Sequence, residues 1–434
     1  MIYQDISGFF QTGKEHVGLH KIDLERSILQ VSRVSEKLRE NIVQNTYPFL
    51  TSVQETEDIK RLLPVLKRFS ENLETIIVLG TGGSSLGGQT VTALRDGGVG
   101  FHFSKPSLYF LENIDPFTLN LLINHVDLEK TGLLVISKSG TTSETLAQVL
   151  TCEKLWAQKN LSPFFIKNTL VVTEAKSSPL RRFAQYLGIL CLDHDPKVGG
   201  RFSVFSLVGL IPLMCANLDP LKLRRGGYQV LEKFLTKSIT ESTPALGAAA
   251  LYALMMERGI TQTVLMPYVD RLAPFGLWFR QLWAESLGKD GIGQTPIRAM
   301  GTVDQHSQLQ LYLDGPKDKV FTLLGLEGKT AFEDKALLSS RDPELDYLDE
   351  MSLGSLLKAE EHATFQSLLQ KGCPVRRLSF NRLDEEVLGA LFMHFMLETL
   401  LMGTLLKVDP LTQPAVEEIK RLTKVYLTEA KKIK

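Results

Sequence analysis

Short apolar runs alternate with helical periods through the first half of the chain. Five runs of four or five mostly apolar residues lie at 75–79, 107–111, 133–137, 170–173 and 189–192. Continuous apolar strands separated by helices are typical of a parallel sheet that is covered on both faces. Residues 61–215 are therefore predicted to form one doubly wound α/β domain.

The second half of the chain shows the same alternation less regularly. Apolar runs occur at 263–267, 320–324 and 375–380, set among long helical periods at about 245–258, 275–288, 352–371 and 384–406. A second α/β domain with more helix is predicted over 216–407. Residues 1–60 are predicted to be a helical segment, and 408–434 a last helix that starts near Pro414. The halves are joined without a low-complexity linker, which predicts a tight interface between them.

Charge and cysteine content narrow the possible classes of protein. Lys+Arg and Asp+Glu both number 49, so no basic surplus favours a nucleic acid or an anionic membrane as a partner. The four cysteines lie far apart without a CxxC pair, which predicts no metal site and no disulfide framework. The N-terminal residues lack the basic start and apolar core of a signal peptide, so a cytoplasmic location is expected.

One apolar segment is long enough to test the expectation that the chain does not enter a membrane. Residues 388–406 form a nearly unbroken run of 19 apolar residues, which is close to the length of a membrane span. The run contains His394 and Glu398 and follows Asp384, a typical residue at the start of a helix. A buried core or subunit-interface helix is predicted in preference to a membrane span.

Two strand-to-helix turns carry the composition of anion-binding loops. The stretch 80–87, Gly-Thr-Gly-Gly-Ser-Ser-Leu-Gly, follows the first strand, and 137–145, Ser-Lys-Ser-Gly-Thr-Thr-Ser-Glu-Thr, follows the third. Glycines let a backbone approach a ligand, while hydroxyls and helix N-termini suit a phosphate. A tight turn without a ligand is the alternative for the first loop. For the second it is a well-capped helix, since Thr141 and Glu144 have the spacing of a capping box. The density of donors favours phosphate binding.

Three further residues are candidates for the chemistry. Arg201 follows two glycines, and a guanidinium on such a turn can approach a ligand oxyanion closely. Gln281 and Glu285 share a helix face, and an isolated histidine, His306, follows 21 residues after Glu285. A carboxylate and a histidine can form an acid/base pair. A surface ion pair, a solvated glutamate and a structural histidine are the corresponding alternatives.

Taken in order, these pieces resemble the glucose-6-phosphate isomerase family, whose two halves are sugar-isomerase-type (SIS) domains. The match is collinear over about 75–425 and consists of the motifs GTGGSSLG, SKSGTTSET, VGGRFSVFS, ESLGK, QHSQ and QPAVEEIK. Gly140 replaces an aromatic residue that is common in the longer eukaryotic enzymes, and Leu411-Thr412 stands where Phe-Asp is frequent. The chain therefore looks like the compact bacterial branch, and these differences concern sugar selectivity more than the reaction.

The resemblance implies roles for residues of this sequence. It implies a phosphate loop that contains Ser137, Lys138, Ser139, Thr141 and Thr142. It implies substrate contacts at Gly82, Gly83, Ser84 and Gln281. Glu285 would be the base that moves the proton, Arg201 would stabilise the enediolate, and His306 and Lys420 would assist ring opening. The last helix would pack back on the site.

The expected activity is the reversible conversion of glucose 6-phosphate to fructose 6-phosphate through a cis-enediol, in glycolysis and gluconeogenesis. One carboxylate can move the proton and a fixed guanidinium can stabilise the charge, so neither a metal nor a cofactor is expected. The family implies a homodimer in which His306 enters the neighbouring subunit's site. A mannose-6-phosphate or dual-specificity isomerase and a phosphosugar-sensing protein without activity are the alternatives.

Overall fold

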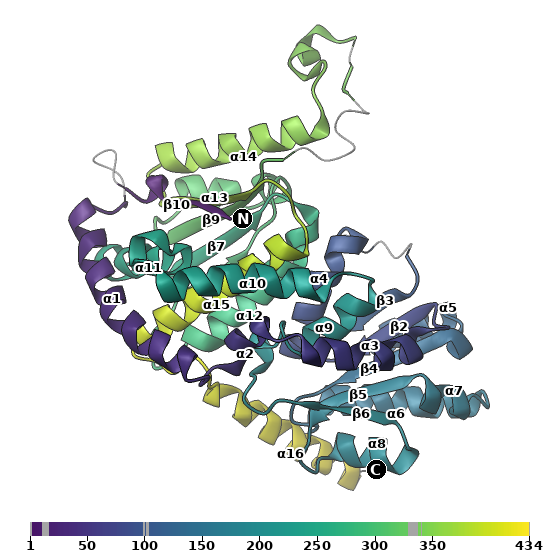
Figure 1. The fold of residues 1–434 in the computed structure, drawn as a ribbon. Helices are drawn as coiled ribbons and strands as arrows, with labels where there is room; N and C mark the ends of the chain where they lie inside the picture. The colour runs from purple at the N-terminus through teal and green to yellow at the C-terminus, as the bar shows by residue number, and fades with distance from the viewer. Residues whose placement is uncertain are drawn as a thin grey trace.

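Two five-stranded sheets organise the chain (Figure 1). The structure is a computed structural model that describes residues 2–10, 17–98, 100, 104–328, 337–339 and 341–433. In Figure 1 the sheet formed by the second half lies at the upper left and the sheet formed by the first half at the lower right. The predicted fold class, α/β with two mainly parallel sheets that are flanked by helices, is confirmed.

The first sheet consists of parallel strands in the order β3-β2-β4-β5-β6. The strands are β2 (Thr75–Leu79), β3 (Ser107–Leu111), β4 (Thr131–Ile136), β5 (Thr169–Glu174) and β6 (Leu190–His194). One face is covered by α5 (Pro116–His125), α6 (Ser143–Gln158), α7 (Ser162–Lys167) and α8 (Pro179–Leu187). The other is covered by α3 (Glu57–Ser70) and α9 (Leu207–Cys215), and α4 (Leu86–Asp96) packs beside α9. Every strand predicted here from an apolar run is present, within two residues at each end.

The second sheet has the order β1-β10-β9-β7-β8, with β1 antiparallel to its neighbour. Its strands are β1 (Tyr3–Asp5), β7 (Gln262–Pro267), β8 (Thr295–Arg298), β9 (Lys319–Leu326) and β10 (Val375–Phe380). Its helices are α10 (Pro220–Thr236), α11 (Thr243–Arg258), α12 (Ala273–Leu287), α13 (Leu309–Asp314), α14 (Leu353–Gln370) and α15 (Glu385–Leu405). The helices α1 (Lys21–Val43) and α2 (Pro48–Thr51) lie between β1 and α3 in the chain, and α16 (Glu417–Ile433) follows α15.

Two edge strands are absent from the sequence prediction. β1 has only three residues, so it shows no alternation, and it joins the sheet by pairing with β10. Residues 1–60 are therefore not purely helical as predicted. β8 contains Pro296 and ends in the charged Arg298, a composition that disfavours a central strand but is tolerated at an edge. Both strands form by pairing with neighbours, which local sequence does not reveal.

The long apolar helix α15 is the core of the second half. In its most apolar stretch of 18 residues, 94% is buried inside the protein. The helix packs against α10, α11 and α12. Glycines allow the helices to approach closely: a Cβ at Gly226 would lie 1.7 Å from the Glu386 carbonyl oxygen, and one at Gly389 1.9 Å from that of Leu223. Because the chain itself covers α15, this helix gives no argument for a second subunit.

Candidate active site

The two loops singled out by their composition meet at one edge of the first sheet. The strands β2 and β4 are adjacent and parallel, so the loops that follow them leave the sheet at the same end. The loop after β2 contains the 3-10 turn η3 (Gly82–Ser84), and the loop after β4 is 137–142. Open α/β sheets bind ligands at this edge, where neighbouring connections diverge to opposite faces.

The glycine loop packs directly on the Arg201 turn and on α12. A Cβ at Gly83 would lie 2.2 Å from the Gly200 carbonyl carbon, and one at Gly82 2.8 Å from Nε2 of Gln281. Gly82 also has φ of +56°, a left-handed conformation that favours glycine. Backbone therefore approaches backbone here, which brings the first sheet and the helix of Glu285 into one site.

Arg201 is the centre of this contact. Its side chain is 3% exposed, and its Nε donates to Ser286 Oγ at 2.8 Å. Nη1 donates to Glu285 Oε2 at 3.1 Å and to Gln413 Oε1 at 2.8 Å. Nη2 donates to the carbonyl oxygens of Pro410 at 2.6 Å and Thr412 at 3.2 Å. All five N–H donors of the guanidinium are thus used, so its position is fixed.

The charge of this guanidinium persists despite its burial. Burial lowers the pKa of Arg201, and the neighbouring Glu285 opposes that change. An arginine remains protonated at neutral pH even after a shift in this direction. The site therefore contains a fixed positive charge in a largely water-free position, where it acts more strongly than in solvent.

Glu285 lies in the last turn of α12, and each of its two carboxylate oxygens accepts a hydrogen bond from a different residue. Oε2 accepts from Arg201, and Oε1 accepts from Gln281 Nε2 at 3.0 Å. The Glu285 side chain is 33% exposed, so it borders accessible space, whereas Gln281 Oε1 is buried without a hydrogen-bond partner.

The hydroxyl loop leaves the N-terminus of α6 open. Thr142 is the N-cap residue but makes no side-chain capping bond; its Oγ1 lies 2.9 Å from Ser137 Oγ instead. The capping box expected from Thr141 and Glu144 is therefore not formed, because Thr141 Oγ1 pairs with Ser139 Oγ at 2.8 Å. Uncapped amides at the start of a 16-residue helix, beside four hydroxyls, suit a phosphate dianion.

Gly140 and Lys138 shape this loop. Gly140 has φ of +64°, and a Cβ there would lie 2.1 Å from Ser178 Oγ, which excludes a larger side chain at this position. Lys138 Nζ donates to the Pro196 carbonyl oxygen at 2.8 Å and lies 3.9 Å from Glu174. Burial lowers the pKa of Lys138. The lysine links the hydroxyl loop to the segment that leads into Arg201.

Two residues that the sequence places in the site are not part of this cluster. His306 is exposed at the end of η8 (Val303–His306), and no hydrogen bond or ion pair is seen between it and Glu285 or Arg201. Lys420 lies on α16, where it is 64% exposed and forms an ion pair with Glu417 at 2.6 Å. The side chains described for α16 are exposed or half-buried, so the structure brings only the preceding residues 410–413 to Arg201.

Three contacts of the cluster were missed by the sequence reasoning. Ser286 and Gln413 bind Arg201, and Lys289 Nζ donates to the carbonyl oxygens of Glu285 at 2.7 Å and Ser286 at 2.6 Å. Lys289 thereby satisfies carbonyl groups at the end of α12. Ser286 and Lys289 stand inside the ESLGK motif and Gln413 opens QPAVEEIK, so the motifs themselves were the available signal.

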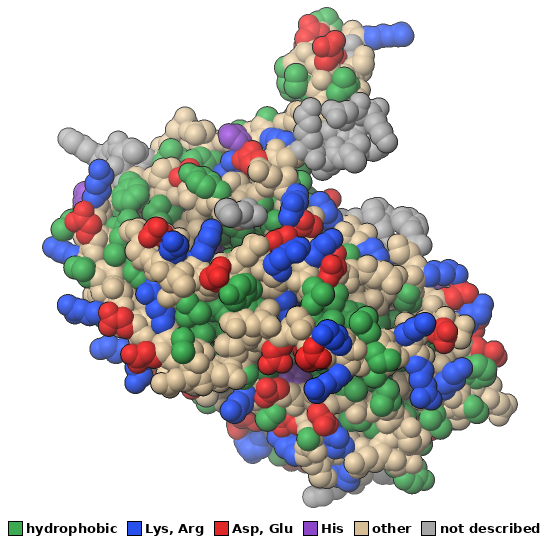
Figure 2. Space-filling model, viewed as in Figure 1, with side chains coloured by type: hydrophobic (Ala, Val, Ile, Leu, Met, Phe, Trp, Pro, Cys, Tyr) green, Lys and Arg blue, Asp and Glu red, His purple; other side chains and the backbone are tan. Residues whose placement is uncertain are grey.

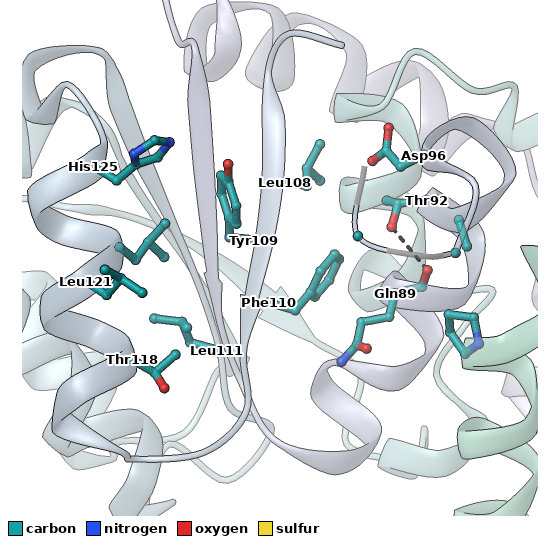
Figure 3. A pocket seen from close by; sticks show the side chains of 15 residues that line it. Gln89, Thr92, Asp96, Leu108, Tyr109, Phe110, Leu111, Thr118, Leu121 and His125 are labelled. Atoms are coloured by element: carbon teal, nitrogen blue, oxygen red, sulfur yellow. Dashed lines mark hydrogen bonds between the residues drawn. The ribbon is translucent and has the colours of Figure 1, made fainter. Parts of the chain in front are cut away.

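A separate cavity of about 670 Å³ lies at the edge strand β3 (Figure 3). Tyr109 and Phe110 from β3, Leu121 and His125 from α5 and Gln89 from α4 surround it in that view. Its lining is mainly apolar, and Arg201, Glu285 and the hydroxyl loop are not among the lining residues. This cavity therefore does not belong to the cluster.

Together, the fold and the cluster define an α/β protein that has a hydroxyl-rich loop at a helix N-terminus and a carboxylate beside a fixed guanidinium at one edge of its first sheet. That combination is the one expected of a phosphosugar isomerase. A family model described as phosphoglucose isomerase matches residues 66–317. The chain belongs to the phosphoglucose isomerase family.

Individual relatives agree with this assignment. The "Probable glucose-6-phosphate isomerase" of Methanococcus maripaludis is 34% identical over 421 residues, which cover 96% of this chain and 92% of the relative. The glucose-6-phosphate isomerase of Rubrobacter xylanophilus is 34% identical over 91% of this chain and 93% of its own length. Among solved structures, a hypothetical protein of Thermus thermophilus has a TM-score of 0.85 at 29% identity, covering 98% of this chain and 100% of that chain.

Proposed function

We propose that the chain interconverts glucose 6-phosphate and fructose 6-phosphate, the reaction that serves glycolysis and gluconeogenesis. The observation that carries the proposal is the contact of Glu285 with Arg201, 3.1 Å apart, beside the loops that follow β2 and β4. Related proteins named glucose-6-phosphate isomerase cover more than nine-tenths of the chain, which supports this substrate pair.

Glu285 is the proposed base. Isomerisation removes a proton from the carbon beside the carbonyl and returns it to the neighbouring carbon, so one carboxylate that faces both carbons can carry it. The C–H electron pair forms the C=C bond of the enediol while the carbonyl oxygen gains negative charge. Arg201 stabilises that negative charge through its own positive charge. The protein acceptors already hold the guanidinium in place, so it need not rearrange during the reaction.

The phosphate group is proposed to bind the hydroxyl loop. The residues are Ser137, Lys138, Ser139, Thr141 and Thr142, at the open N-terminus of α6. The sugar would lie between this loop and α12, against Gly82, Gly83, Ser84 and Gln281. Binding energy from the phosphate would position the reacting carbons against Glu285.

His306 and Lys420 are proposed to open the sugar ring, with His306 supplied by the other subunit of a homodimer. His306 is exposed on its own chain, as a residue presented to a neighbour would be. Lys420 is exposed on α16, the helix that follows residues 410–413 at Arg201, and the motif QPAVEEIK that contains it supports its role.

Two broader assignments accompany the mechanism. We propose a first α/β domain over 61–215 and a second over 216–407, preceded by 1–60 and followed by 408–434, since each α/β segment supplies one parallel sheet. We also propose a cytoplasmic location, since all four cysteines are free thiols.

A coupled assay tests the reaction. Fructose 6-phosphate is supplied with a chelator present, and formation of glucose 6-phosphate is followed by its dehydrogenase. We expect turnover without added metal, because Glu285 and Arg201 supply the base and the positive charge. A protein that binds fructose 6-phosphate but never converts it would contradict the proposal and favour a sensor. Mannose 6-phosphate in the same assay measures the sugar selectivity.

Subunit complementation tests the shared site. The variants Glu285→Gln and His306→Ala are each expected to be inactive, and both are then unfolded and refolded together. Random pairing gives about half heterodimers, each with one intact site, so about a quarter of wild-type activity returns. If His306 acts within its own chain, mixing restores no activity.

A further inference from the structure

A cavity of about 690 Å³ lies at the carboxyl-terminal edge of the second sheet. Its walls come from the residues that follow β7 (268–271), the residues that follow β8 (301–303) and the end of β9 at Leu326 and Gly328. The first turns of α14, from Leu353 to Glu361, close one side. None of the residues proposed for the isomerase reaction lines this cavity.

The cavity occupies in the second sheet the place that the proposed active site occupies in the first. In each sheet the first parallel strand is second from one edge; the second strand forms that edge, and the third and fourth lie on the other side of the first. This order is β3-β2-β4-β5 in the first sheet and β8-β7-β9-β10 in the second. The loops after the first and third strands diverge in both, and such a point is where open α/β sheets bind ligands.

A partly buried guanidinium without a carboxylate partner lines the cavity. Arg271 Nη1 donates to the Leu383 carbonyl oxygen at 3.1 Å, and this is the one hydrogen bond seen for that side chain in the described part of the chain. Burial lowers the pKa of Arg271, and no neighbouring acid opposes the shift. A half-buried arginine whose other donors have no acceptor among the described residues is suited to bind an oxyanion through two parallel hydrogen bonds.

Two other polar groups border the same space. Lys358 lines the cavity from α14, and among the described residues it has no ion pair. Tyr268 also lines the cavity; it is 2% exposed, and its hydroxyl lies beside the Thr364 hydroxyl of α14. Burial raises the pKa of Tyr268, while the Thr364 hydroxyl acts in the opposite direction. Tyr268 therefore forms part of the wall, and the two cationic side chains are the groups left to bind a ligand.

The acids near the cavity do not neutralise these cations. Glu361 is nearly fully buried, and its Oε1 accepts from Arg377 Nε at 2.6 Å, so its charge is already balanced. Asp270 is exposed to solvent. Gly301, Gly328 and Gly354 contribute backbone to the wall, which allows a ligand to approach closely.

We propose that this cavity is a second anion site, which binds a small phosphomonoester through Arg271 and Lys358. Arg271 lies in the turn η7 (Asp270–Leu272), immediately before the first residue of α12. Leu353 and Gly354, the first residues of α14, also line the cavity, so the field of that helix N-terminus adds to the two side-chain charges. The ligand occupies this second site independently of the substrate site, because the two sites share no residue.

Calorimetric titration of the full chain with sn-glycerol 3-phosphate tests the proposal. This probe is a phosphomonoester that has no carbonyl group to isomerise. The double variant Ser137→Ala/Thr142→Ala removes hydroxyls of the proposed active-site loop, so binding that remains reports the second site. We expect this background to bind one probe molecule per chain, and glycerol without phosphate to give no heat of binding.

Arg271→Met in that background is expected to weaken the remaining binding by at least about tenfold, since a charge-assisted pair is lost. The matched control is Arg280→Met, which removes an exposed arginine from α12 and should leave binding unchanged. If Arg271→Met lowers the thermal midpoint of unfolding, Lys358→Met serves as the second variant, and it should weaken probe binding in the same way. The proposal is wrong if the background binds no probe, or if Arg271→Met and Lys358→Met, both folded, bind as the control does. If the chain lacks isomerase activity but gives the expected binding results, the second site is still supported.

Discussion

Two arginine–glutamate pairs in this chain show how an ion pair in the proposed site differs from one in the core. Lys, Arg, Asp and Glu side chains are also scattered over the face of the molecule shown in Figure 2. In the proposed site, Arg201 and Glu285 are joined by one hydrogen bond of 3.1 Å, and their side chains are 3% and 33% exposed. In the second half, Arg376 and Glu398 are joined by two hydrogen bonds of 2.6 and 2.8 Å, and their side chains are 1% and 0% exposed. Both arginines are buried, so the difference lies in the glutamates.

The two glutamates differ in what remains available to a ligand. Burial raises the pKa of Glu398, but the charge and hydrogen bonds of Arg376 outweigh it and hold the pKa at about 2. A carboxylate so committed cannot exchange protons with a substrate near neutrality. Glu285 shares one oxygen with Arg201 and offers the other side to Gln281 and to accessible space. The ion pair with one hydrogen bond and an accessible carboxylate therefore lies in the proposed site, and the pair with two hydrogen bonds and no exposure lies in the core.

The largest effect is expected for Glu285→Gln, which should lower catalysis without weakening substrate binding. Glu285→Gln should lower kcat by about 100- to 10,000-fold, because general-base catalysis is lost. Phosphosugar affinity, measured by calorimetry, should stay within about threefold, since the phosphate loop is unchanged. The control Glu257→Gln removes an exposed carboxylate from α11 and should leave kcat as it is. A turnover number for Glu285→Gln close to wild type would remove Glu285 from the mechanism.

The core pair should show the opposite profile. Glu398→Gln leaves Arg376 buried with an unbalanced charge, which should cost about 3–5 kcal/mol of unfolding free energy in urea titrations. The variant's kcat should remain near wild type at temperatures where it is folded. The double variant Arg376→Met/Glu398→Leu should recover most of the stability, because apolar residues can replace a buried pair. If Glu398→Gln were as stable as the parent, the pair would not be structural.

Acid should lower the free energy of unfolding by weakening the Arg376–Glu398 pair. The folded pKa of Glu398, about 2, lies below its ordinary value of 4.5, so its stabilisation is complete above 4.5 and lost as the pH falls towards 2. Burial also lowers the pKa of His394, so the folded state loses stability as the pH falls below 6.5. Urea titrations between pH 7 and pH 3 should show a loss on the order of 2–3 kcal/mol from Glu398. Glu398→Gln should flatten that dependence; an unchanged slope would place its origin elsewhere.

The smallest expected effect concerns the positioning of Arg201. Ser286→Ala removes the acceptor for Arg201 Nε and should lower kcat about tenfold with KM little changed, because a hydrogen bond to a charged group is lost. Ser286→Thr, which keeps a hydroxyl, should restore part of the activity. The control Ser35→Ala removes a buried hydroxyl that has no hydrogen-bond partner, and should leave kcat unchanged. A fall in stability without a change in kcat would assign Ser286 to packing alone.

Much of the fold could be predicted from the sequence where the signal is periodic. The strands of the first sheet appear as apolar runs because both faces are buried, and α15 appears as an apolar stretch for the same reason. β1 and β8 could not be predicted, because three residues and a proline-containing edge give no pattern. In the site, the hydroxyl loop and Arg201 could be predicted from their residue types in the sequence. The acceptors at Pro410 and Thr412 were not, because a backbone carbonyl leaves no trace in a side-chain pattern.

The dependence of Arg201 on residues 410–413 has a consequence for synthesis of the protein. Three of its five hydrogen bonds end on a segment more than 200 positions further along the chain. While the ribosome is still adding the last residues, both sheets can already be complete, yet the guanidinium lacks these acceptors. A nascent chain, or one shortened by a protease before Pro410, would contain every strand of both sheets and still lack three of the acceptors that fix the charge beside Glu285. The release of residues 410–413 from the ribosome, and not the closure of the sheets, would fix the guanidinium, before a second subunit adds His306 to the proposed site.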